Sequence, residues 1–205
     1  MKIFLLRKRF SFLIVALILG GLCATVWADS PLTSTDFHKQ YLDVPMVQAA
    51  QKASKLDSAM MEFFSEDSNP VDVKVAIINA IGWKFDGQNN AGVYSSFLEK
   101  KYGSKGKAMY GKMTRDELLC LGYLTAMDDY FDVNPALPIL RRAAAKNSRS
   151  FTVAIIYALT KAQNVDDYKA IWKATEKVLT NKNFKKDMRP KAVEAIVSYM
   201  KLYQE

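Results

Sequence analysis

Hydrophobic residues are most concentrated in residues 71–85, which read VDVKVAIINAIGWKF. On a helix, apolar side chains from this segment cover nearly the whole circumference. The polar residues Asp72, Asn79 and Asp86 are seven positions apart and share one narrow strip. A helix that is apolar almost all round has to be enclosed by other elements. The pattern therefore predicts that residues 71–85 form the central helix of a helical domain.

The same segment also has some features of a strand, because Val71, Val73 and Val75 alternate with polar residues. The apolar pattern, however, continues without a break and is too long for a typical buried strand. Asn69 and Pro70 precede it, and both favour a helix start. Asn can cap free backbone N–H groups, and Pro loses nothing at the first helical position. We therefore expect a helix.

Helical spacing of apolar residues recurs along the rest of the chain. Residues 45–65 have a one-sided amphipathic pattern that predicts a single helix. Thr114 and Glu117 have the spacing of a capping box, which opens a helix expected over residues 118–130. The other predicted helices cover residues 90–102, 134–146, 150–163, 166–180 and 190–204.

Two further segments are predicted to lie outside the regular helices. Residues 29–44 are expected to form an irregular lead with one short helical turn after Thr35. Residues 103–113 (GSKGKAMYGKM) predict a flexible basic linker. Residues 106–112 have the GxxxxGK spacing of a phosphate-binding loop, but Met113 stands where Ser or Thr should hold magnesium, and no strand precedes the loop. We therefore expect no nucleotide site.

A weak internal repeat bears on the arrangement of the helices. Residues 75–81 (VAIINAI) and 153–159 (VAIIYAL) are identical at five of seven positions, at an offset of 78 residues. Residues 122–127, between them, place small and large side chains similarly. A period near 40 with a buried inner helix is typical of HEAT-like arrays, although apolar helices also share Ala, Ile and Val by composition. The predicted fold class is all-α, as stacked antiparallel helical hairpins or an irregular bundle, in one domain over residues 45–205.

The first 28 residues have the features of a signal peptide. A basic region is followed by an apolar stretch over residues 10–22, and Val26 and Ala28 supply small residues before a cleavage site. A lipoprotein anchored through Cys23 is disfavoured because Leu22 stands where Gly, Ala or Ser is required. An uncleaved anchor is disfavoured because the stretch is slightly short for a membrane span. We expect a periplasmic or secreted protein with no membrane insertion after cleavage.

Charge divides the remaining chain into two unlike parts. Residues 29–133 carry 15 Asp or Glu and 11 Lys or Arg, a net charge of −4, whereas residues 134–205 carry 6 and 14, a net charge of +8. A basic surface favours an acidic protein or an envelope polyanion as partner, and nucleic acid is not expected outside the cytoplasm. The candidate interaction surface comprises Lys173, Lys177, Lys182, Lys185, Lys186, Arg189 and Lys191.

Few residues are candidates for catalysis or metal binding. Cys120 lies in the apolar run LLCL and is expected to be a core residue. His38, the one histidine of the chain, is flanked by polar residues and is expected to be a solvated surface residue without a metal partner. Asp128, Asp129 and Asp132 form a carboxylate cluster, in which Asp129 and Asp132 can share a helix face.

Residues 86–90 (DGQNN) place oxygen side chains at alternate positions, as a calcium loop does. Ala91 stands in place of the invariant glycine, however, and Phe97 in place of the bidentate acid. We therefore expect a turn, and neither a metal nor a cofactor.

These features favour a binding protein over an enzyme. Helical arrays present extended concave surfaces that bind partners without chemistry of their own. The predicted function is that of an exported, non-enzymatic helical interaction protein. The alternatives are a periplasmic immunity protein that blocks a toxic envelope-acting enzyme, a structural or assembly component and, least favoured, a hydrolase that uses an Asp pair.

Overall fold

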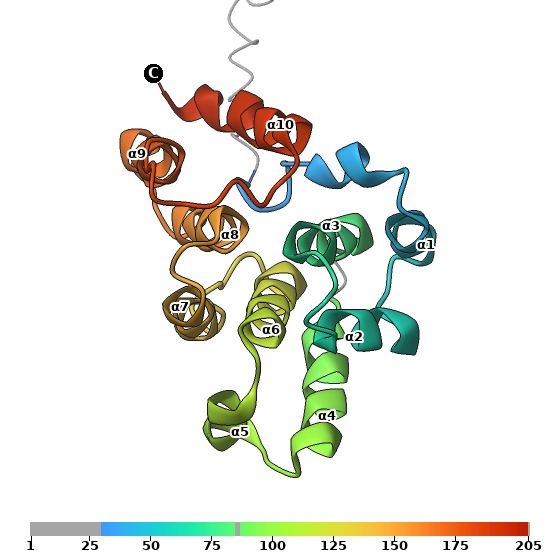
Figure 1. Cartoon of the computed structure of the whole chain (residues 1–205). Helices are drawn as coiled ribbons and strands as arrows, with labels where there is room; N and C mark the ends of the chain where they lie inside the picture. The colour runs from blue at the N-terminus through green and yellow to red at the C-terminus, as the bar shows by residue number, and fades with distance from the viewer. Residues whose placement is uncertain (1–29, 85–86, 205) are drawn as a thin grey trace, which may run out of the picture.

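The computed structural model describes residues 30–84 and 87–204. These residues form ten α-helices and two short 3₁₀ helices, with no strand among them, so the predicted all-α class is confirmed (Figure 1). No helix in these two ranges is both long and apolar enough to cross a membrane. The predicted signal peptide, residues 1–28, lies outside the described residues.

The helices follow one another through short connections. In chain order they are η2 (Phe37–Tyr41), α1 (Pro45–Ala53), α2 (Ser58–Ser65), α3 (Val71–Ile81), α4 (Asn90–Tyr102), α5 (Gly106–Lys112), α6 (Arg115–Asp128), α7 (Leu137–Lys146), α8 (Phe151–Ala162), α9 (Tyr168–Leu179), α10 (Pro190–Met200) and η3 (Lys201–Tyr203). The predicted bounds are confirmed for α4 and hold within two residues for α8 and α9.

Three inner helices, α3, α6 and α8, form the centre of the molecule and pack on one another. Residues 73–81 of α3 are all buried, which confirms the prediction of an enclosed central helix. The other helices surround these three (Figure 1). Three elements pack against α3, namely α1, α2 and η2. Helices α4 and α7 pack against α6. Helices α7 and α9 pack against α8.

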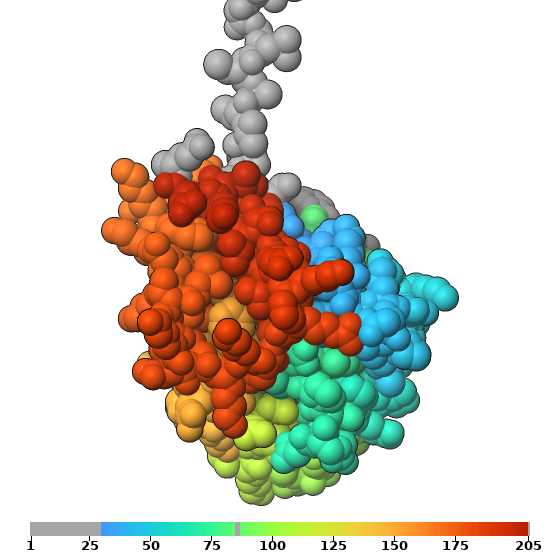
Figure 2. Space-filling model, turned by 45° about the horizontal axis from the view of Figure 1, so that its top comes forward, coloured from blue at the N-terminus to red at the C-terminus, as the bar shows by residue number. Residues whose placement is uncertain are grey.

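Residues 30–41, predicted as an irregular lead, contribute to the same core. Leu32, Phe37 and Tyr41 are fully buried. The expected helical turn after Thr35 is present as η2, which packs against α3 and α10. Figure 2 shows this early segment in blue, directly beside the C-terminal helix in red.

His38 is buried, so the prediction of a solvated histidine is wrong. Its backbone N–H donates to Asn79 Oδ1 at 3.0 Å, and its ring Nδ1 lies 2.8 Å from the same oxygen. The Asn79 amide also donates to the Thr35 carbonyl and to the Tyr123 hydroxyl. This buried asparagine on α3 is a hydrogen-bond partner for the histidine, so burial of His38 leaves neither its backbone N–H nor its ring Nδ1 unpaired.

The prediction of a single helix over residues 45–65 is wrong, because these residues form two helices, α1 and α2. Ser54 adopts a left-handed backbone conformation, with φ of 51°, which ends α1. Asp57 then caps α2 by accepting a hydrogen bond from the Met60 N–H at 2.9 Å. An aspartate cap of this kind gives the chain a local reason to start a new helix.

The central helix begins after Pro70 as predicted but ends at Ile81 rather than at residue 85. Gly82 has φ of 72° and ψ of −164°, a conformation that is essentially restricted to glycine. The predicted capping role of Asn69 is wrong, since Pro70 is the N-cap residue and no side chain caps the helix; the Asn69 amide nitrogen donates to the Phe63 carbonyl at 3.0 Å.

The flexible linker predicted over residues 103–113 is also wrong, because this segment contains α5. Met109 and Met113 are four residues apart and both are buried, so the short helix has an apolar face that packs inward. Lys146 on α7 donates to the Met113 carbonyl at 2.6 Å and fixes the end of the segment.

The predicted capping box is present, and its glutamate reaches a second helix. Glu117 N–H donates to Thr114 Oγ1, and Thr114 N–H donates to Glu117 Oε2 at 2.8 Å. The carboxylate also accepts from the Tyr102 hydroxyl at 2.6 Å and from the Lys101 ammonium at 2.7 Å. Burial opposes ionisation of Glu117, but these hydrogen bonds outweigh it, and the pKa of Glu117 lies below its usual value. The ionised carboxylate therefore joins α4 to α6.

Replacement of this carboxylate should alter the pH dependence of stability. A carboxyl with a lowered pKa in the folded state contributes stability above its unfolded pKa of about 4.3, and this contribution is lost as the pH falls through the folded pKa. We expect Glu117→Gln to lower the free energy of unfolding at pH 7 by about 1–3 kcal/mol. The loss should shrink below about pH 4. Urea unfolding at pH 7 and below about pH 4 measures the change in the free energy of unfolding.

The matched control is Glu62→Gln, since Glu62 is exposed on α2. Exposed substitutions of this kind change stability by less than about 0.5 kcal/mol. An equal loss for Glu117→Gln at both pH values would contradict the assigned role of the ionised carboxylate.

Gly122 sets the close approach of α6 to α7. A Cβ atom at this position would lie 2.7 Å from Leu140 Cγ and 3.2 Å from the Leu140 backbone nitrogen. We expect Gly122→Ala to destabilise the fold, because overpacking typically costs about 1–3 kcal/mol. Gly111→Ala on α5 is the control, since its Cβ would meet nothing within 4 Å. It should be neutral or stabilising by up to about 1 kcal/mol. Thermal melts that shift both variants in the same direction would refute this packing.

Candidate functional site

A groove of about 330 Å³ lies between α7, α8 and α9. α8 forms its floor with Ala154, Tyr157, Ala158 and Lys161, which recur at helical spacing on one face. α7 and α9 form the walls. Figure 1 shows these three helices stacked along one side of the molecule, with α8 in the middle. Most of the surface that lines the groove is apolar.

Basic residues border the groove. Lys161 and Lys177 line it, and no acidic residue is found among the described residues of its lining. Lys161 Nζ lies 5.7 Å from the centroid of the Tyr157 ring, which is within the range of a cation–π contact. Arg149 and Lys182 are exposed and directly adjoin lining residues in the sequence. The groove thus combines an apolar interior with a positive border.

The connector between α9 and α10 closes one end of the groove and is itself fixed. Phe184 lines the groove. Lys185 N–H donates to the Arg149 carbonyl at 2.7 Å, and Phe151 N–H donates to the Lys185 carbonyl at 3.3 Å. Asp187 Oδ1 accepts from the Thr152 N–H at 2.9 Å. These bonds hold the lysines of the connector beside the start of α8.

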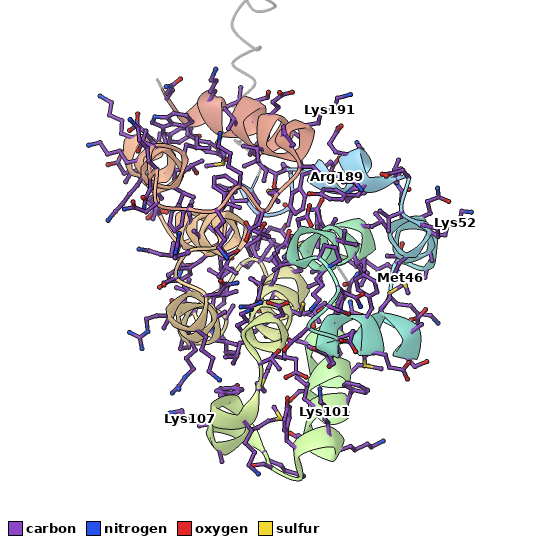
Figure 3. The ribbon with its side chains drawn as sticks, in the orientation of Figure 1. Met46, Lys52, Lys101, Lys107, Arg189 and Lys191 are labelled. Carbon is purple, nitrogen blue, oxygen red and sulfur yellow. The ribbon has the colours of Figure 1, made fainter. Side chains whose placement is uncertain are left out.

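The structure divides the seven basic residues predicted as an interaction surface. One group lies along α9 and the connector, at or next to the groove: Lys173, Lys177, Lys182 and Lys185. Lys186 and Arg189 line a separate depression with Asp72. Figure 3 shows Arg189 and Lys191 at the start of α10, on the side of η2 and away from the α7–α9 stack. The predicted residues therefore border two different depressions.

Arg189 is engaged in contacts within the protein. Its guanidinium lies 4.5 Å from the centroid of the Tyr41 ring and donates to the Gln40 carbonyl at 3.0 Å and to Asp43 Oδ1. The hydrogen bond from Arg189 lowers the pKa of the Asp43 carboxyl. Arg189 thus joins the η2 segment to the start of α10.

The groove itself was missed by reasoning from the sequence. Lys161 lies outside the predicted basic cluster, and Ala154 and Ala158 carry no functional group that draws notice. The available signal was the spacing of these two alanines, four residues apart on a face of α8 that also carries Lys161. Finding the groove from that signal would also have required the positions of α7 and α9.

The three carboxylates considered for hydrolysis serve mainly as backbone caps. α6 ends at Asp128, so the prediction that Asp129 and Asp132 share a helix face is wrong. Asp129 Oδ1 accepts from the Asp132 N–H at 3.1 Å, and Asp128 Oδ2 accepts from the Ala91 N–H at 2.7 Å. Burial raises the pKa of the Asp128 carboxyl. A depression of about 510 Å³ borders Asp128 and Asp129, and its described lining includes Lys84 and Gly87, the last and first residues of the two described ranges.

Cys120 is fully buried, and burial raises the pKa of its thiol well above the usual value. A thiol in this state is a poor nucleophile. No group of three or more His, Cys, Asp or Glu side chains suited to a metal ion occurs within residues 30–84 and 87–204. The predicted turn at residues 86–90 lies partly outside these ranges.

Comparisons with protein-family models, with curated proteins and with solved structures give no significant match to this chain. A functional proposal therefore depends on the groove, its border and the charge distribution of the chain.

Proposed function

We propose that this chain is an exported, non-enzymatic helical binding protein that engages an acidic partner protein through the groove between α7, α8 and α9. The observation that carries the proposal is an apolar groove lined by Lys161 and Lys177, with no acid among its described lining residues. Complementary charge steers encounter and suppresses wrong partners. Burial of apolar side chains at the centre of an interface supplies most of the affinity.

The chemistry of the groove supports a protein over an envelope polyanion. Ala144, Ala154 and Tyr157 present apolar surface in the groove, which a chain of sugars and phosphates cannot cover with apolar groups. A protein supplies apolar side chains for the interior and carboxylates for the border. Such a division into apolar centre and polar rim is typical of protein interfaces.

We also propose that the fold is an irregular bundle and not a regular HEAT-like array. In a linear stack of hairpins each repeat contacts its nearest neighbours. Here α3 and α8 pack on each other as well as on α6. The matching residues 75–81 and 153–159 both lie in inner helices, which supports a shared pattern of burial without a regular repeat.

Export is the part of the proposal that rests on residues 1–28. We expect the protein isolated from its native host to begin at Asp29 and to carry no lipid, because Val26 and Ala28 suit signal peptidase. Intact mass spectrometry measures the N-terminus directly. A diacylglyceryl mass on Cys23, or an uncleaved chain, would contradict this expectation.

Two double variants of equal net charge test the binding proposal. Lys161→Glu with Lys177→Glu reverses the lysines that line the groove. Lys52→Glu with Lys191→Glu reverses two exposed lysines, on α1 and α10, that lie away from the α7–α9 stack (Figure 3). We expect the first pair to abolish capture of the partner from an envelope extract and the second pair to retain it. Capture by the wild type should weaken with salt, because surface charges are screened beyond about 8 Å at physiological ionic strength.

Equal capture by the wild type and both variants, at low and high salt, would overturn the proposal. Mass spectrometry of the captured protein then separates the narrower hypotheses. An immunity role requires a toxic enzyme as partner, whereas an assembly role requires an envelope component.

A further inference from the structure

The groove is lined in its middle by four alanines beside Tyr157. Ala144 on α7, Ala154 and Ala158 on α8 and Ala174 on α9 all face it. Small residues allow the backbone of another helix to approach closely. The floor helix α8 has 12 residues, which corresponds to about 18 Å at a rise of 1.5 Å per residue. Lining residues extend from Ser150 to Lys161, so the space is a trough that runs along α8 between walls formed by α7 and α9.

Most polar groups of the trough lie toward its ends. Asn147 and Asn181 follow the C-terminal ends of α7 and α9, near the start of α8, whereas Lys161 lies near the end of α8. Between these ends the polar groups of the described lining are the Tyr157 hydroxyl and the Lys177 ammonium, so hydrogen-bond partners are few. An extended peptide or a sugar chain needs such partners along its whole length. A helix has already satisfied its own backbone, so an alanine-lined trough suits it.

We infer that the trough docks one amphipathic α-helix of the acidic partner, laid along α8. The inference rests on the proposed function, which it extends by naming the form of the partner. Apolar side chains at positions i, i+3 or i+4 and i+7 of the partner helix lie against the partly exposed Ala154, Tyr157 and Ala174, as in other helix-in-groove complexes. Carboxylates on either side of this apolar stripe lie beside Lys161 and Lys177.

A designed peptide of about five turns is the probe, since about 18 residues are needed to span the trough. It carries leucines at the stripe positions, glutamates on both flanks and a fluorescent label. A second peptide has the same composition in scrambled order, so that its charge is kept and its stripe is lost. We expect fluorescence anisotropy to show binding of the striped peptide at least about tenfold tighter than that of the scrambled one.

Two substitutions on α9 provide a matched pair for the site. Ala174→Phe fills the trough, whereas Ala170→Phe adds the same side chain one turn earlier, outside the lining. Both alanines are half-buried. We expect Ala174→Phe to weaken binding of the striped peptide by at least about tenfold and Ala170→Phe by less than about twofold. Amide chemical shifts of the wild type, followed during titration, need no variant and should change most in α7, α8 and α9.

The outcomes separate this inference from the function on which it rests. Equal binding of striped and scrambled peptides would overturn the inference while leaving acidic-partner binding intact. The inference would also be overturned if the double variant Lys161→Glu, Lys177→Glu, here called the groove-lysine variant, lost partner capture while the wild type bound no peptide at about 1 mM. Binding of phosphatidylglycerol vesicles that Ala174→Phe abolishes would assign the trough to acyl chains instead. Self-association that Ala174→Phe abolishes would assign it to a second copy of this chain. If the groove-lysine variant captures the partner normally and no peptide binds, both proposals fail.

Discussion

A lysine buried among apolar side chains fixes the centre of this molecule. Lys74 on α3 is fully buried, and its ammonium donates to Asp116 Oδ2 on α6 at 2.8 Å and to the Glu66 carbonyl at the end of α2 at 2.7 Å. Removing one partner of a buried ion pair costs about 3–5 kcal/mol, because the other charge is left in the interior without compensation. The relative positions of α2, α3 and α6 are therefore tightly constrained. Since α8 packs on α3 and α6, the floor of the groove stands on this constrained centre.

The elements that the sequence predicted well are those governed by local chemistry. Helix α4 ends at Tyr102, as predicted, where Gly103 adopts a left-handed conformation. Thr114 and Glu117 cap α6, as their spacing predicted. The elements that were wrong depend on contacts across the fold. His38 is buried because Asn79, 41 residues away, accepts its hydrogen bonds. Residues 106–112 form a helix because Met109 packs into the core. Hydrophobic periodicity identifies an apolar face, but it does not identify the surface that covers it.

The candidate site was predictable in its charge and not in its shape. The excess of lysine in the C-terminal half could be counted directly, and Lys177 is common to the predicted surface and the groove. The groove, however, is made largely of alanine, which has no chemistry to recognise, and its walls come from helices whose relative positions depend on tertiary packing. Arg189 belongs to the predicted basic surface, and its guanidinium is engaged with Tyr41 and Asp43, which the sequence did not indicate. Counting charges therefore gives the sign of the charge in each half of the chain, and only the geometry shows where those charges lie.

The contact between η2 and the start of α10 bears on the order in which the parts of the chain fold. Arg189 N–H donates to the Tyr41 hydroxyl across 148 residues of sequence. Contacts of such long range carry a large loop-closure cost and form late. The connector that leads into α10 is also the segment that closes one end of the groove. Completion of the groove thus depends on the connector that follows α9, and a chain that ends before Phe184, even one with all three inner helices in place, does not yet present the finished groove.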